Sequence, residues 1–172
     1  MIKIICIGKI KEKFYRDAIE EYIKRLSKYH KVEIIELPDS NIKQEKELIL
    51  KKIDSKDYII TMEIEGKQLT SIELSEMLDK TFLNYSNITF IIGGSDGLDD
   101  EIKNLSNYKL SFSKLTFPHQ LFRVILLEQI YRSFKIINNE TYHKWTKCKI
   151  WFFNYYFDFK YDILNIEWRF IW

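Results

Sequence analysis

Two segments of the chain combine residue types that can hold a small ligand. In the first, Ile91-Ile92-Gly93-Gly94-Ser95-Asp96-Gly97, glycines follow a run of aliphatic residues typical of a buried strand. Glycine lets a ligand approach the backbone because no Cβ stands in the way, and α/β folds bind ligands where parallel strands end. The same pattern also fits an ordinary strand–helix turn. It is neither a P-loop nor a G-x-G-x-x-G motif, so nicotinamide binding has little support.

The second segment, residues 110–119, is a short strand that leads into a loop with hydroxyl side chains and then into a helix begun by Pro118. Such a loop can offer backbone amides and carbonyls to the edge of an adenine ring, with Phe112 and Phe117 as walls. The alternative is a plain strand–helix connection that Thr116 caps.

Charged side chains further along could act on a substrate. Glu128 falls within the apolar stripe of the last predicted helix, where a carboxylate is costly unless it is paired. Arg132 lies one turn on and is the obvious partner, although it could instead face a phosphate or a base. Three histidines and two cysteines are too scattered for a metal site, so no metal is expected.

Alternating strand and helix patterns through residue 144 must position these segments. Thr70 and Glu73 have the spacing of a capping box, and Glu65-Gly66-Lys67 has the composition of a turn. Five strands alternating with five helices predict an α/β fold, with a mostly parallel sheet and helices on both faces. The strands are expected at residues 2–7, 32–37, 58–62, 88–92 and 109–112, and the last helix at about 118–137.

Composition limits the class of protein. The chain has 172 residues, of which 46% are hydrophobic and 30% charged, so it is not a disordered chain. A formal charge of +2 is too small for a strongly basic nucleic-acid-binding protein, but it leaves room for a local basic patch. The sequence has neither a membrane-length apolar run nor a recognisable signal peptide, so we expect a cytoplasmic protein.

The last 28 residues, 145–172, break the pattern. They include twelve aromatic residues and all four tryptophans, with no glycine or proline. Alternation between apolar and charged residues around Phe159 to Ile163 is typical of a half-buried strand. One interpretation is a β-hairpin that packs on the body or on a partner. The other is read-through past a lost stop codon, and the abrupt change in composition favours it.

Through several motifs together, the sequence resembles the ribosomal RNA large subunit methyltransferase H family, whose members are small SPOUT-class enzymes. The resemblance covers residues 1–144 in order, and its two long motifs are far more specific than a lone glycine loop. The matching segments are Ile7-Gly8-Lys9, Lys24-Arg25-Leu26, Ile34-Ile35-Glu36, Ile64-Glu65-Gly66-Lys67, residues 90–98, residues 110–120, Arg123, Glu128-Gln129-Ile130-Tyr131-Arg132 and Tyr142-His143-Lys144.

The resemblance implies a C-terminal trefoil knot, a homodimer, and S-adenosylmethionine as the cofactor. The implied reaction is methylation of N3 of a pseudouridine in 23S rRNA, at position 1915 in the family. The implied cofactor contacts are Met62, Gly93, Phe112, Ser113, Lys114, Leu115, Thr116 and Phe117. Members normally end near Tyr142-His143-Lys144, where the tail reaches the cofactor of the partner subunit.

The candidate catalytic residues are Tyr142 and His143 as proton acceptors, unless a water serves, and Arg132 as a stabiliser of the uracil-type anion. We expect the enzyme to recognise a folded ribosomal surface. Residues 145–172 extend the terminus that should close the site, so the alternative function is a ribosome- or RNA-binding module with impaired catalysis. A third reading makes the extension an interaction element of an enzyme that is also an adaptor. The candidate RNA contacts are Lys9, Lys11, Lys13, His119, Arg123 and Lys144.

Overall fold

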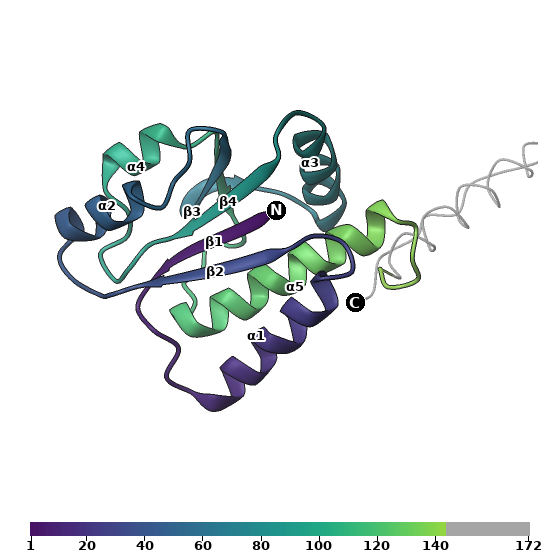
Figure 1. The fold of residues 1–172 in the computed structure, drawn as a ribbon, viewed down its shortest axis with the longest axis horizontal. Coiled ribbons are helices and arrows are strands. Elements are labelled where there is room, and N and C mark those ends of the chain that lie inside the picture. The colour runs from purple at the N-terminus through teal and green to yellow at the C-terminus, as the bar shows by residue number, and fades with distance from the viewer. Residues whose placement is uncertain (144–172) are drawn as a thin grey trace, which may run out of the picture. The chain divides into compact units, whose positions relative to one another are not determined.

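The computed structural model describes residues 1–143, where five strands and five helices form the fold in Figure 1. All described strands are parallel, in the order β2-β1-β4-β3-β5. The predicted parallel α/β sheet is confirmed. Along the chain the elements are β1 (Ile2–Ile7), α1 (Lys13–Leu26), β2 (Val32–Leu37), α2 (Ile42–Leu50), β3 (Asp57–Gln68), α3 (Ser71–Asn84), β4 (Asn87–Ile92), α4 (Asp100–Leu105), β5 (Tyr108–Ser111) and α5 (His119–Ile137).

Helices cover both faces of the sheet because its inner strands are apolar on both sides. All of β1 is buried, and so is β4 apart from its first residue. Helices α1 and α3 pack against α5 on one face, while α2 and α4 lie together on the other (Figure 1). A buried cluster including Ile5, Ile49, Ile91 and Ile102 fills the face under α2 and α4.

Strand β3 differs from its prediction. It continues to Gln68, although Glu65-Gly66-Lys67 predicted a turn. Met62 and Lys67 both pair with Leu110 of β5, so the residues between them bulge out of the ladder. A Cβ on Gly66 would lie 2.8 Å from the β5 backbone, so this glycine allows a close approach of two strands. The turn prediction is wrong, because a turn and a bulge share this composition.

The helix ends test two further predictions. The capping box at α3 is confirmed: the Thr70 hydroxyl accepts from the Glu73 amide, and the Glu73 carboxylate accepts from the Thr70 amide. Thr116 does not cap α5. Pro118 occupies the N-cap position of that helix and Thr116 lies two residues earlier, out of register for capping.

The chain divides into a compact unit, Met1–Glu140, and a second unit, Thr141–Trp172. Lys144 and the whole aromatic segment 145–172 lie outside the described residues, and so do both interpretations of that segment. The trefoil knot implied by the resemblance stays a prediction. Within residues 1–143 no helix is long and apolar enough to cross a membrane.

Candidate active site

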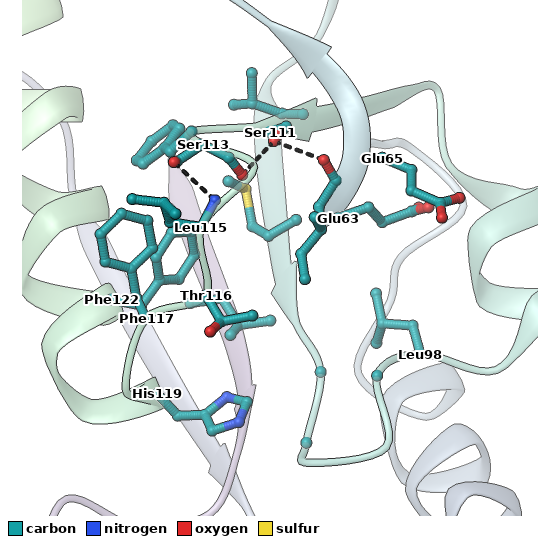
Figure 2. Close-up of a pocket in the computed structure, with 18 of the residues that line it drawn as sticks. Glu63, Glu65, Leu98, Ser111, Ser113, Leu115, Thr116, Phe117, His119 and Phe122 are labelled. Atoms are coloured by element: carbon teal, nitrogen blue, oxygen red, sulfur yellow. Dashed lines mark hydrogen bonds between the residues drawn. The ribbon is translucent and has the colours of Figure 1, made fainter.

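A cavity of about 430 Å³ lies at the carboxyl ends of β3, β4 and β5 (Figure 2). This is the edge at which parallel sheets bind ligands, and the volume is within the ~300–1,000 Å³ typical of small-molecule sites. The structure brings seven of the eight predicted cofactor residues to this cavity. Those seven are Met62, Gly93, Phe112, Ser113, Leu115, Thr116 and Phe117. The eighth, Lys114, is exposed and does not line it.

The loop after β4 is a tight glycine turn that also forms one wall. The amide of Gly97 donates to the Gly94 carbonyl at 3.0 Å, and Gly97 has a φ of +82°. A Cβ on Gly93 would lie 2.5 Å from the Gly97 carbonyl oxygen. Both interpretations of this motif are therefore compatible. The glycines form an ordinary tight turn, and that turn also lines the cavity.

Gly93→Ala is expected to disrupt ligand binding more than folding. The new methyl group must push the 93–97 turn into the cavity or away from it, so we expect affinity for S-adenosylmethionine to fall at least about tenfold, equal to ~1.4 kcal/mol. Isothermal titration of both proteins measures this. Gly97→Asn is a matched control, since asparagine tolerates positive φ and a Cβ there meets no atom within 4 Å. Unchanged affinity in Gly93→Ala would contradict the role given to this wall.

The loop between β5 and α5 is held by its own hydroxyl groups. Ser111 Oγ donates to the carbonyls of Ile64 (2.9 Å) and Ser113 (3.1 Å), and Ser113 Oγ accepts from the Leu115 amide at 2.9 Å. These bonds fix the shape of the loop, whose residues line the cavity (Figure 2).

Three phenylalanine rings support this loop from the side of α5. The ring centroid of Phe122 lies 5.4 Å from that of Phe112 and 5.9 Å from that of Phe117. Rings at these distances pack favourably and keep water from the wall. The prediction that phenylalanines form a wall here is confirmed, although Phe122 was not predicted to belong to it.

The bulge of β3 adds two carboxylates that sequence reasoning missed. Glu63 and Glu65 line the cavity (Figure 2), and Glu63 accepts a hydrogen bond of 2.7 Å from the Thr61 hydroxyl. Lys103 of α4 also lines the cavity. The pKa of the Lys103 ammonium group is raised, first by its hydrogen bond to Asp100 and then by the charges of Glu63 and Glu65. The signal was available, because Glu63 directly follows Met62 and Glu65 lies two residues further along the same strand.

The cavity walls fit a nucleoside cofactor with a zwitterionic end. Most of the lining is apolar, as a purine requires, and it also includes charged groups of both signs, with Glu63 and Glu65 close enough to Lys103 to affect its pKa. An ammonium group can pair with a carboxylate of Glu63 or Glu65, and a carboxylate with Lys103. Across the described residues, no group of three or more His, Cys, Asp and Glu could hold a metal ion.

The prediction that Arg123 contacts RNA is wrong. Its side chain is only 1% exposed. The guanidinium donates to Glu36 at 2.8 Å and to the carbonyls of Ile7 and Gly8 at 2.6 and 2.9 Å. Because these groups come from the ends of β1 and β2, Arg123 ties α5 to the sheet and cannot reach a phosphate.

The lysines after β1 remain candidate RNA contacts, because their side chains are accessible. Lys9, Lys11 and Lys13 are exposed. The amides of Lys11 and Glu12 donate to the Gln120 side chain, at 2.8 and 3.3 Å. This fastens the basic loop to the first turn of α5, next to His119, which itself lines the cavity.

Of the predicted catalytic residues, Arg132 is part of the compact unit, and it does not line this cavity. Arg132 donates to Glu128, as its spacing indicated, so the pairing interpretation is confirmed. It lies thirteen residues after His119 on α5, about 20 Å along the helix axis. Tyr142 and His143 belong to the second unit, which begins beyond α5.

The fold and the cavity are those of an α/β protein with a small-molecule site at the carboxyl edge of a parallel sheet. The family described as "Predicted SPOUT methyltransferase" matches residues 1–143, and the chain belongs to this family. Its cofactor is accordingly S-adenosylmethionine, the methyl donor of SPOUT enzymes.

Named relatives agree with this assignment. The chain is 52% identical to ribosomal RNA large subunit methyltransferase H of Clostridium botulinum (strain Kyoto / Type A2). It is 48% identical to ribosomal RNA large subunit methyltransferase H 1 of Clostridium perfringens (strain SM101 / Type A). Both matches cover 83% of this chain and 99% of the relative. A probable methylase family protein from Haemophilus influenzae Rd KW20 shares the fold, with a TM-score of 0.51 at 16% identity over 91% of this chain and 77% of that one.

Proposed function

We propose that the protein transfers a methyl group from S-adenosylmethionine to N3 of a pseudouridine in 23S rRNA. The observation that carries the proposal is the cavity at the ends of β3, β4 and β5, lined by seven residues of the family's cofactor pattern. The names of the relatives support a large-subunit ribosomal RNA as the substrate.

Two parts of the cavity lining would hold the cofactor. The 112–117 backbone and the Phe112, Phe117 and Phe122 rings suit the adenosine half, while Glu63, Glu65 and Lys103 suit the charged amino-acid end. When bound, the cofactor supplies a methyl group on a positively charged sulfur. The main task of the chain is to hold that methyl group in line with N3, since alignment can supply ~7–11 kcal/mol of a barrier.

The side chains near the C-terminus would manage the proton. N3 of pseudouridine carries a hydrogen that must leave as the new N–C bond forms. His143 or Tyr142 accepts this proton, and Arg132 stabilises the negative charge that develops on the uracil ring. The ion pair with Glu128 keeps the Arg132 guanidinium oriented before substrate arrives.

These groups would come from a second copy of the chain. Support for this comes from Arg132, which α5 carries about 20 Å along the helix axis from His119 at the cavity. A homodimer in which the tail of one subunit closes the cavity of the other resolves this separation.

The test of the function is mass spectrometry of 23S rRNA from a strain that lacks this gene. Complementation with the full chain, or with a chain that ends after Lys144, should restore a methylated pseudouridine. An unmethylated nucleotide in both cases would refute the proposal. Binding of S-adenosylmethionine without transfer by the full chain alone would favour an RNA-binding module impaired by residues 145–172.

The basic loop is expected to make RNA binding dependent on salt. Each phosphate contact contributes roughly 0.7–0.9 to the slope of log K against log salt. Replacing Lys9, Lys11 and Lys13 with alanine should therefore reduce the slope by about 2 to 3, measured by filter binding to ribosomes. Lys80→Ala on α3 is the control, because that exposed lysine is outside the basic loop. A slope equal to that of the control would remove the loop from the RNA interface.

A further inference from the structure

After helix α5 the chain turns at residues 138–140, and two hydrogen bonds back to the helix hold this turn in place. Asn138 Nδ2 donates to the Phe134 carbonyl at 2.8 Å, and Asn139 has a φ of 54°, in the left-handed region. The Glu140 amide then donates to the Lys135 carbonyl at 2.9 Å. The backbone therefore leaves the helix at Glu140 in a defined direction.

The carboxylate of Glu140 has three donors. Its Oε1 accepts from Lys28 Nζ at 2.9 Å and from the Tyr29 hydroxyl at 2.8 Å, and its Oε2 accepts from Lys135 Nζ. Lys135, Lys28 and Tyr29, in that order, lower the pKa of this carboxyl group to about 2. Lys28 and Tyr29 follow α1, so the contact joins the ends of two helices far apart in sequence.

The donors are themselves fixed by aromatic packing. The Tyr29 ring stacks on Phe134, with centroids 5.5 Å apart and an angle of 10° between the planes. Lys28 Nζ lies 5.3 Å from the centre of the Tyr29 ring, and Lys135 Nζ lies 5.4 Å from that of Tyr131. An exposed ion pair usually moves freely and contributes little. Here Tyr29 and Lys135 are packed against aromatic rings, so two of the three donors hold the carboxylate in a defined position.

We infer that Glu140 is a positioning residue, which sets the point where the catalytic tail leaves the domain. This inference rests on the proposed function of Tyr142 and His143. Tyr142 is two residues after Glu140, so chain length keeps their Cα atoms within about 7 Å. A shift of the exit point moves the tail with it, and a misplacement of ~1 Å can cost about a hundredfold in rate.

A purely structural role for this clamp predicts different results. In that case, removal of the carboxylate lowers stability and changes nothing else. If Glu140 positions the tail, its loss lowers kcat far more than cofactor affinity, because the residues that line the cavity lie away from Glu140, towards the start of α5.

The test compares Glu140→Ala with Glu21→Ala. Glu21 also pairs with a basic residue, Arg25 (2.8 Å), but it lies on the exposed surface of α1. Methyl transfer to ribosomes from a strain lacking the gene is followed with tritiated S-adenosylmethionine, and cofactor affinity by isothermal titration. We expect kcat to fall at least tenfold in Glu140→Ala, with cofactor affinity within twofold of wild type and Glu21→Ala unchanged in both. Glu140→Gln, which keeps an acceptor for Tyr29, should recover part of the loss.

Three results would overturn the inference. They are equal kcat values for Glu140→Ala and Glu21→Ala, a parallel loss of cofactor affinity, and no recovery in Glu140→Gln. If Glu140→Ala does not fold, Glu140→Gln decides alone, and wild-type kcat in that variant counts against the inference. Failure of the proposed function has a separate signature, because the wild-type protein would then not methylate ribosomes at all.

Discussion

At a cofactor concentration well below the Kd of Gly93→Ala, a heterodimer of two impaired variants is expected to recover about half of the wild-type methyltransferase activity. In Gly93→Ala the cavity wall is displaced, and in His143→Ala the candidate proton acceptor is lost, which costs roughly 10²–10⁴ in rate. If the tail acts in trans, the heterodimer has one intact cavity closed by one intact tail. Co-expression with two different tags isolates this species, and tritiated-methyl transfer to ribosomes measures it.

The control for this experiment carries both substitutions in one chain, paired with a wild-type chain. In trans, the intact cavity receives the defective tail and the intact tail meets the defective cavity, so almost no activity remains. In cis, the wild-type chain would keep its own site and half of the activity would survive. The two heterodimers contain the same substitutions, so a difference between them reports only which subunit supplies His143. Half activity in the control would contradict the dimeric site.

The secondary structure was predictable where the signal lies within a short stretch of sequence. Strands β1 and β4 are nearly continuous apolar runs, and the Thr70–Glu73 spacing is sufficient for a capping box. Periodicity could not distinguish the bulge at Gly66 from a turn. That choice depends on Leu110 of β5, more than forty residues later, which pairs with both Met62 and Lys67. Composition alone contains no information on such a partner.

The site was predictable only through the resemblance. The glycine and phenylalanine loops each had an ordinary structural interpretation, and the cavity exists because β3, β4 and β5 end at one edge of the sheet. Glu63 and Glu65 could have been found by continuing the strand past Met62. Glu140 could not, because its donors Lys28 and Tyr29 lie 111 or more residues away.

Arg123→Met is expected to lower the free energy of unfolding by about 3 kcal/mol. The substitution keeps much of the side-chain volume, but it leaves the Ile7 and Gly8 carbonyls without their donor and Glu36 without its partner. A buried acceptor left unpaired costs roughly 1–3 kcal/mol. Urea unfolding followed by circular dichroism, at one fixed protein concentration, measures the loss.

Arg25→Met provides the matched comparison. Arg25 also forms an ion pair, with Glu21, but both side chains are more than 40% exposed. Pairs of that kind contribute about 0.2–1 kcal/mol, so the two methionine variants should differ by at least ~2 kcal/mol. The comparison also tests the structural role assigned to Arg123. A phosphate contact would leave stability near that of Arg25→Met and weaken ribosome binding, whereas a buried tie between α5 and the ends of β1 and β2 lowers stability first. Arg123 lies next to the loop of Lys9 and Lys11 but does not itself contact RNA. We therefore expect Arg123→Met to weaken RNA binding only under conditions in which the variant is partly unfolded.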